Sequence, residues 1–182
     1  NLDEYCDLPQ SDKNSYYTFM HENLFNHIDV KEENVNFLNG NAEDTEAECE
    51  RYDNLISENK IDIQLLGVGR NGHIAFNDPH VADFNDPCRI KKVDLDQKCR
   101  QQQVNDGCFA TIDDVPTHAI TLSIPIMMKA ERIFVIVPTA LKADAIGKIY
   151  NGEITQACPA SILRTHKAAT LYTDVAGAAQ IA

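Results

Sequence analysis

The tract GVGRNGHIAFNDP, residues 67–79, places a histidine inside a glycine-rich loop. His73 lies two residues after Asn71 and five residues before Asp78. A carboxylate beside an imidazole fixes the tautomer of the ring and raises its basicity, and a neutral imidazole can pass a hydroxyl proton at about pH 7. A turn whose histidine only caps a backbone carbonyl is the alternative. Three glycines would let the backbone approach a ligand closely; they are Gly67, Gly69 and Gly72.

A second candidate for chemistry is the acidic stretch NLDEYCDLP at residues 1–9. It gathers Asp3, Glu4 and Asp7 beside a tyrosine, where a strand is expected to end. Crowded carboxylates raise one another's pKa, which suits a general base or a metal ligand. A solvated acidic turn is the alternative, and the spacing alone does not separate the two.

The first six letters of the glycine-rich tract spell G-x-G-x-x-G, the fingerprint of a dinucleotide-binding turn. That site needs a strand before the tract, a helix at the third glycine and an acidic residue about 20 positions on. Residues 61–66 predict the strand, and Asp94 is a candidate for the acid. However, Pro79, Pro87 and two Asn-Asp pairs follow the third glycine and predict turns in place of the helix. We interpret the tract as a ligand-binding loop at the carboxyl end of a strand, and not as a dinucleotide site.

The predicted strands and helices that must position these loops alternate along the chain, which predicts an α/β fold. Helical spacing predicts helices over residues 15–28 and 45–59, residues 97–104 are a short polar helix candidate, and a further helix is expected over residues 140–152. Apolar and β-branched runs predict strands over residues 61–66, 119–124, 132–138 and 169–173. Thr139 is expected to cap the last helix and Gly152 to end it. The expected architecture is one Rossmann-like domain over residues 1–182, an open and mainly parallel sheet flanked by helices.

The composition excludes several classes of partner. The 182 residues carry a formal net charge of −12, which disfavours nucleic acid and anionic membrane surfaces as partners. A small anionic substrate is still compatible, since a few local cations and backbone amides can outweigh a distant net charge. No apolar run approaches the ~18 residues of a membrane span. The six cysteines are scattered without a CxxC pair, which favours reduced thiols in a cytosolic protein.

The segments LDEYCDLP, SYYTFMHENLF, NFLNG and LLGVGRNGHIAFNDP, taken together and in this order, resemble the glucosamine-6-phosphate deaminase (isomerase) family. The resemblance runs from Asn1 to the strand near Thr170. The related 6-phosphogluconolactonases share the fold and a G-x-G-x-x-G-H core but look different after the histidine.

The resemblance implies conversion of an amino-sugar phosphate to fructose 6-phosphate and ammonia, with no metal or organic cofactor. It implies that Asp3 moves a proton between C2 and C1 of the open-chain sugar and that His73 assists ring opening. Two positions depart from the family pattern. Asn71 stands where aspartate is common. Asp78 replaces a glutamate, so its side chain is one methylene shorter, and whether it contacts His73 is left open by the sequence.

For the substrate phosphate, the resemblance implies contact with Lys142 in the first turn of a helix, where the helix N-terminus adds to the attraction. The family's arginine on the preceding helix has no direct match, because Gln103 occupies that register. Arg100, one turn earlier, is the expected substitute, and a solvated surface arginine is its alternative. Since members are often oligomeric, the resemblance also favours a homo-oligomer.

In the family, a threonine- and glycine-rich phosphate loop precedes the DEY strand. A sheet entered at NLDEY would lack its N-terminal strands and expose apolar faces. We therefore expect the sequence to be a piece or processed product of a larger polypeptide, not competent as an enzyme alone. Three alternatives stay open for the activity: galactosamine 6-phosphate as substrate, a 6-phosphogluconolactonase-like hydrolase, or a sensor of sugar phosphates without turnover.

Overall fold

A computed structural model describes residues 1–181 of the chain. The chain divides into two compact units. The first comprises Asn1–Tyr52 and Ile90–Thr121, and the second runs over Asp53–Arg89 and from Leu122 onward. That the two together form one domain stays a prediction.

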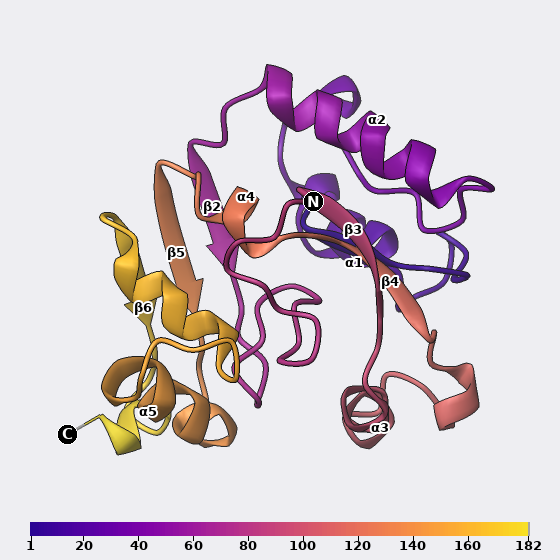
Figure 1. The fold of residues 1–182 in the computed structure, drawn as a ribbon. Helices are drawn as coiled ribbons and strands as arrows, with labels where there is room; N and C mark the ends of the chain where they lie inside the picture. Colours follow the sequence, from indigo (N-terminus) through magenta and orange to yellow (C-terminus); the bar gives the residue numbers. More distant parts are fainter. Residues whose placement is uncertain (182) are drawn as a thin grey trace. The chain divides into compact units, whose positions relative to one another are not determined.

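The second unit is built on a parallel sheet in the order β2-β5-β6. Strands β2 (Ile63–Leu66), β5 (Arg132–Ile136) and β6 (Ala169–Tyr172) lie side by side and point the same way (Figure 1). The predicted strands over residues 61–66, 132–138 and 169–173 are thereby confirmed, each within a few residues. Because the strands are parallel, their carboxyl ends meet at one edge of the sheet, where open α/β sheets bind ligands.

Helix α5 (Ala143–Asn151) buries Ile146 and Ile149 and packs against the short helices η5 (Pro159–Thr165) and η6 (Gly177–Gln180). Its predicted end at Gly152 is confirmed. The predicted cap is wrong: a separate turn, η4 (Ala140–Lys142), precedes α5, and the Thr139 side chain makes no capping bond. The unit also contains α4 (Ile124–Met127), which the sequence did not predict.

The two faces of this sheet differ in exposure. Leu66, Ile133 and Val135 are buried on one face. The alternate positions are exposed on the other face, including four large apolar residues: Ile63, Leu65, Ile136 and Tyr172. Parallel sheets are normally covered on both faces, so an apolar face of this size is unusual.

The first unit contains a sheet in the order β1-β4-β3. Strand β1 (Asp3–Tyr5) pairs antiparallel with β4 (His118–Leu122), so that Asp3 lies opposite Thr121. The expectation of a mainly parallel sheet therefore holds for β2, β5 and β6 but not for this pair. Strand β3 (Ile90–Asp94) was not predicted, because it buries only Ile90 and Val93, which are three positions apart and do not give the alternation of a strand.

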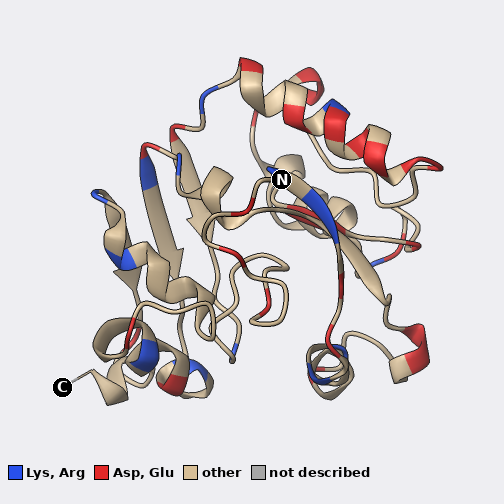
Figure 2. Ribbon diagram, viewed as in Figure 1, with Lys and Arg blue, Asp and Glu red and all other residues tan. Residues whose placement is uncertain are grey.

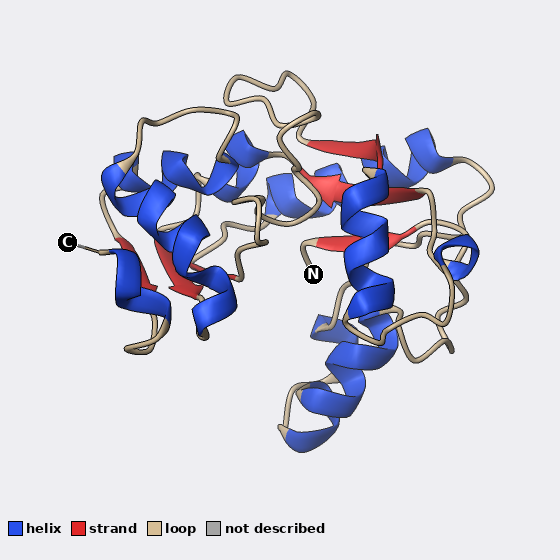
Figure 3. Ribbon diagram, turned by 90° about the horizontal axis from the view of Figure 1, so that it is seen from below, coloured by secondary structure: helices blue, strands red, loops and turns tan. Residues whose placement is uncertain are grey.

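The first unit also contains helices, which are blue in Figure 3. The predicted helix over residues 15–28 is α1 (Tyr16–Asn23) followed by η1 (Phe25–His27), and α3 (Gln97–Asn105) matches its predicted range. The unit also contains two short turns, η2 (Glu32–Asn34) and η3 (Ile112–Asp114).

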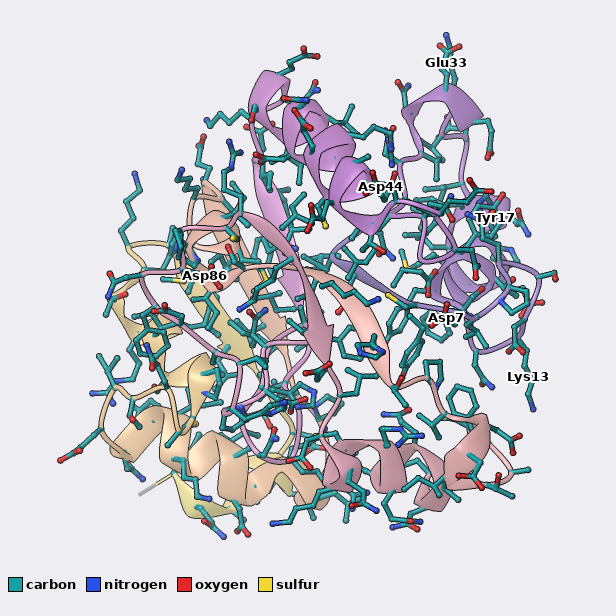
Figure 4. All side chains as sticks on the ribbon, turned by 45° about the vertical axis from the view of Figure 1, so that its right-hand side comes forward. Asp7, Lys13, Tyr17, Glu33, Asp44 and Asp86 are labelled. Carbon is teal, nitrogen blue, oxygen red and sulfur yellow. The ribbon has the colours of Figure 1, made fainter. Side chains whose placement is uncertain are left out.

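Helix α2 (Thr45–Glu58) confirms the predicted helix over residues 45–59. Asp44, labelled in Figure 4, begins it by accepting the backbone N–H groups of Glu46 and Ala47, both at 3.0 Å. Five of the 28 acidic residues of the chain lie on this helix and are red in Figure 2.

Two expectations from composition can be compared with the structure. None of the helices described in residues 1–181 is long and apolar enough to cross a bilayer. All six cysteines lie within these residues as thiols, with Cys6 and Cys158 buried.

Candidate active site

The glycine-rich tract leaves the carboxyl end of β2, as predicted. Among the described residues, no helix forms between residues 67 and 89, where the chain runs through turns and an isolated bridge joining Ile74 to Asn77. The prediction that turns replace a helix after the third glycine is thereby confirmed, so the tract does not provide the helix N-terminus on which a dinucleotide fingerprint places the pyrophosphate.

The tract brings His73, Asp78 and Asn71 together. Nδ1 of His73 lies 2.8 Å from Oδ1 of Asp78, and the Asn71 amide donates to the same oxygen at 2.8 Å. The Asn71 carbonyl oxygen in turn accepts the backbone N–H of His73 at 3.1 Å. The shorter aspartate therefore does reach the imidazole. The Asp78 side chain is only 2% exposed, so solvent has little access to its contact with the imidazole.

Two of the three glycines have local structural reasons. A Cβ on Gly69 would lie 2.3–2.5 Å from three atoms of the His73 ring, so the imidazole needs glycine beneath it. Gly72 has φ +87° and a Cβ there would also meet Cys158 Sγ at 2.6 Å. Gly67 is different, because a Cβ there would meet open space. The role of these glycines in substrate binding stays a prediction.

Asn77 anchors the loop from within, and the sequence reasoning did not single it out. Its side chain is fully buried and its amide donates to the carbonyls of Ile74 at 3.2 Å and Leu122 at 2.8 Å. A buried amide with two carbonyl partners holds the turn that carries His73 and Asp78. Its position in the motif FNDP was the only signal available.

Lys142 lies at the end of η4, after strand β5. Its ammonium donates to the backbone carbonyl of Val68 at 2.7 Å, which joins the β5 exit to the glycine-rich loop after β2. The turn that carries it contains Thr139 at φ 84°, ψ 149°. For a residue other than glycine this conformation costs about 1 to 3 kcal/mol and persists only where surrounding contacts hold it.

Asp3 lies at the start of β1 in the first unit, half-buried. Burial raises the pKa of its carboxyl from 3.8 to about 7, and the neighbouring Glu4 carboxylate adds to the rise. The expectation that crowded carboxylates raise the pKa is thus confirmed for Asp3, with burial as the larger cause. A carboxyl with a pKa of about 7 can both accept and return a proton near neutral pH.

The other two carboxylates of the acidic stretch differ from Asp3. Glu4 accepts the backbone N–H groups of Tyr5, Tyr16 and Tyr17 at 2.9–3.0 Å, so it caps α1. Burial raises the pKa of Glu4 and these three hydrogen bonds oppose the rise. Asp7 is exposed in the turn after β1 (Figure 4). The reading as a solvated turn therefore fits Asp7, and a structural role fits Glu4.

Arg100 in α3 directs its guanidinium to backbone carbonyls. It donates to Ile112 O at 2.6 Å and to Val115 O at 2.8 and 3.2 Å. These bonds tie α3 to the turn η3 of the same unit. A role for Arg100 in phosphate binding stays a prediction, and it would require some of these bonds to be exchanged.

A sequence profile of the family described as glucosamine-6-phosphate isomerases/6-phosphogluconolactonase matches residues 2–172 of this chain. Among curated proteins, the chain is 44% identical over 174 residues to a glucosamine-6-phosphate deaminase of Bacillus cereus (strain G9842). One from Bacillus anthracis (strain A0248) matches to the same degree. Each match covers 96% of this chain and 64% of the relative, so the chain spans somewhat less than two thirds of the length of these relatives.

Solved structures show the same likeness. A monomeric glucosamine-6-phosphate deaminase superposes with a TM-score of 0.92 at 41% identity, covering 99% of this chain and 73% of that one. A 6-phosphogluconolactonase from Thermotoga maritima has a TM-score of 0.72 at 20% identity, covering 94% of this chain and 69% of that one. At that identity, the second likeness shows the fold alone.

Proposed function

Because the chain belongs to the family of glucosamine-6-phosphate isomerases and 6-phosphogluconolactonases, we propose that its protein converts glucosamine 6-phosphate and water to fructose 6-phosphate and ammonia. The observation that carries the proposal is the contact of His73 with buried Asp78 on the loop after β2. The chain that contains this contact is 44% identical to a protein named glucosamine-6-phosphate deaminase.

Asp3 is proposed as the base that moves a proton from C2 to C1 of the open-chain sugar. Removal of the C2 proton forms an enolamine, and return of the proton to C1 forms an iminium group at C2. Water then adds to C2 and the nitrogen leaves as ammonia, which balances the reaction. The pKa of about 7 supports this role, because both protonation states of Asp3 are populated at neutral pH.

His73 is proposed to pass a proton between the ring oxygen and the anomeric hydroxyl when the pyranose opens. The contact of Asp78 with Nδ1 supports this role, because it leaves Nε2 as the atom that exchanges a proton. Asn71 is proposed to position Asp78 through its amide bond.

Lys142 is proposed to bind the substrate phosphate, together with backbone amides near Gly67, Gly69 and Gly72. No metal or organic cofactor takes part in the proposed reaction. We propose a cytoplasmic enzyme. The expected homo-oligomer remains a proposal, and one structurally similar deaminase is described as monomeric.

The test is release of ammonia from glucosamine 6-phosphate and galactosamine 6-phosphate and hydrolysis of 6-phosphogluconolactone, measured side by side. The protein should be assayed as the 182-residue chain and within the longest polypeptide that contains it. Ammonia from glucosamine 6-phosphate alone is expected, with His73→Gln inactive and His27→Gln, at an exposed histidine of the first unit, as its matched control.

The remaining outcomes of this panel are informative. Preferred release from the galactosamine substrate would change the epimer but keep the chemistry. Lactone hydrolysis without ammonia would replace the proposal by the lactonase activity of the family. Tight binding of the sugar phosphate without any turnover in the longer polypeptide would identify a sensor.

A further inference from the structure

The turn that carries Lys142 includes the strained residue Thr139. The carbonyl of Thr139 accepts the backbone N–H of Lys142 at 3.1 Å, so the orientation of the Thr139 peptide sets the direction in which Lys142 leaves the turn. Its φ of 84° is in the region that favours glycine, and a relaxed threonine would rotate away from it. Some contact outside the turn must therefore hold it.

Asp174 supplies that contact from the segment after β6. Its Oδ2 accepts the backbone N–H of Thr139 at 3.1 Å, and its Oδ1 accepts the N–H of Gly177 at 2.6 Å. Both carboxylate oxygens thus accept main-chain N–H groups. The first donor lies 35 residues before Asp174 in the sequence, and the second lies three residues after it. One carboxylate joins the β5 exit to the start of η6.

Two neighbouring features keep Asp174 in place. The Thr173 hydroxyl donates to Val137 O at 2.8 Å, and Val137 N–H donates to Tyr172 O at 2.9 Å, so the exits of β5 and β6 are joined just before the turn. A Cβ on Gly177 would lie 2.2 Å from Oγ1 of Thr173 and 3.1 Å from Oδ1 of Asp174. A larger residue at this position would therefore clash with the Thr173 hydroxyl that joins the two strand exits.

We propose that Asp174 is a positioning residue for phosphate binding: it holds Thr139 in its strained conformation and thereby sets the direction of Lys142. The inference rests on the proposed function, in which Lys142 binds the phosphate. Asp174 touches no reacting atom in this role, and it acts through the turn alone.

The charge of Asp174 and its contact with Thr139 predict opposite effects of its removal on phosphate binding, so one experiment separates the two. A carboxylate near a phosphate repels it, so removal of Asp174 for its charge alone would tighten phosphate binding. If Asp174 positions the turn, its removal weakens binding in spite of the lost repulsion.

The experiment compares Asp174→Ala and Asp174→Asn with the parent chain by NMR titration with glucosamine 6-phosphate, inorganic phosphate and glucosamine. We expect the Kd for glucosamine 6-phosphate to rise about 10-fold in Asp174→Ala, as for a lost hydrogen bond to a charged group. Asp174→Asn keeps one oxygen acceptor and should lose less. The exposed Glu153→Ala removes the same charge in the same unit and serves as the matched control.

A second substitution tests whether Asp174 acts by opposing the backbone strain at Thr139. Thr139→Gly adopts the conformation without cost, so Asp174→Ala should weaken binding less in a Thr139→Gly background than in the parent. Equal losses in the two backgrounds, or tighter binding in Asp174→Ala, would overturn the inference.

Hydrogen exchange of the Thr139 and Gly177 amides separates this inference from the proposed function. Faster exchange of both amides in Asp174→Ala, with the fold retained, supports the positioning role even if the parent chain binds neither phosphate ligand. In that case it is the proposed function that fails. Unchanged protection of Thr139 overturns the positioning role whatever the ligand data show.

Discussion

At the scale of single residues, the proposed role of Asp3 as the base is linked to a cost in stability. A group that takes a proton from carbon and returns it works best when its pKa lies near the working pH. Burial brings the pKa of Asp3 to about 7, whereas the same burial disfavours the charged form that the proposed reaction needs. Activity and stability should therefore respond to its substitution in opposite directions.

Asp3→Asn should abolish deamination while it leaves binding of the sugar phosphate nearly unchanged. The amide is close in shape but cannot accept the C2 proton, and loss of a positioned base costs ~10² to 10⁴ in rate. Steady-state kinetics on the longest active polypeptide, with the exposed Asp7→Asn as control, would measure this. Turnover within a few-fold of the parent would rule out Asp3 as the base.

The same substitution should stabilise the fold above neutral pH. Because the folded pKa of Asp3 is raised from 3.8 to about 7, its contribution to stability is fully present below pH 3.8 and lost as pH rises to about 7. At pH 8, Asp3→Asn should be more stable than the parent by about 1 to 4 kcal/mol, and the difference should vanish at low pH. Urea unfolding at both pH values checks the sign. A variant that is less stable at pH 8 would contradict the raised pKa.

Asp78→Asn should lower turnover, and His73→Gln should lower it more. The Asp78 carboxylate holds Nδ1 of His73 at 2.8 Å, and an amide can turn its NH₂ group toward the ring and favour the wrong tautomer. We expect a loss of roughly 10² in kcat, since orientation of a base is part of general acid–base catalysis. The control is Asp83→Asn, a carboxylate of the same loop that pairs instead with Asn85 and Gln156. Equal activity of the two variants would show that the contact has no role in turnover.

At the scale of elements, the two faces of the sheet β2-β5-β6 differ in burial, so substitutions on them should differ in their effect on the free energy of unfolding. In the 182-residue chain, Leu66→Thr should destabilise the second unit by about 2 to 5 kcal/mol, because Leu66 is only 3% exposed. Leu65 is the adjacent residue of the same strand, but it is 56% exposed, so Leu65→Thr should stay within about 0.5 kcal/mol. Thermal unfolding of this matched pair is the measurement. A comparable loss in Leu65→Thr would show that something covers this face in solution.

At the scale of the whole molecule, charge limits the partners. Twenty-eight acidic side chains stand against 16 basic ones. We expect no retardation of DNA or RNA in gels at ~50 mM salt and no sedimentation with anionic vesicles, since non-specific binding depends on neutralised phosphates. A polybasic protein of similar size provides the positive control. A salt-dependent shift at micromolar protein would contradict this expectation.

The sequence by itself determined the features that depend on neighbours along the chain. Pro79 and the Asn-Asp pairs excluded a helix after Gly72, because proline removes a donor and fixes its own φ. Runs of β-branched and apolar residues located β2, β5 and β6, helical periodicity located α2, and a short polar run located α3. The same local reasoning placed His73 and Asp78 in one loop at the end of a strand.

Only the tertiary structure decided the features that join distant segments. The reach of Asp78 to His73 depended on how the loop closes around Asn77, and the pKa of Asp3 depended on burial. The antiparallel pairing of β1 with β4 brings together residues more than 110 positions apart. The strained Thr139 is held by Asp174, 35 residues on. Patterns along a chain report the preferences of neighbours, whereas strain, burial and long-range hydrogen bonds exist only once remote segments meet.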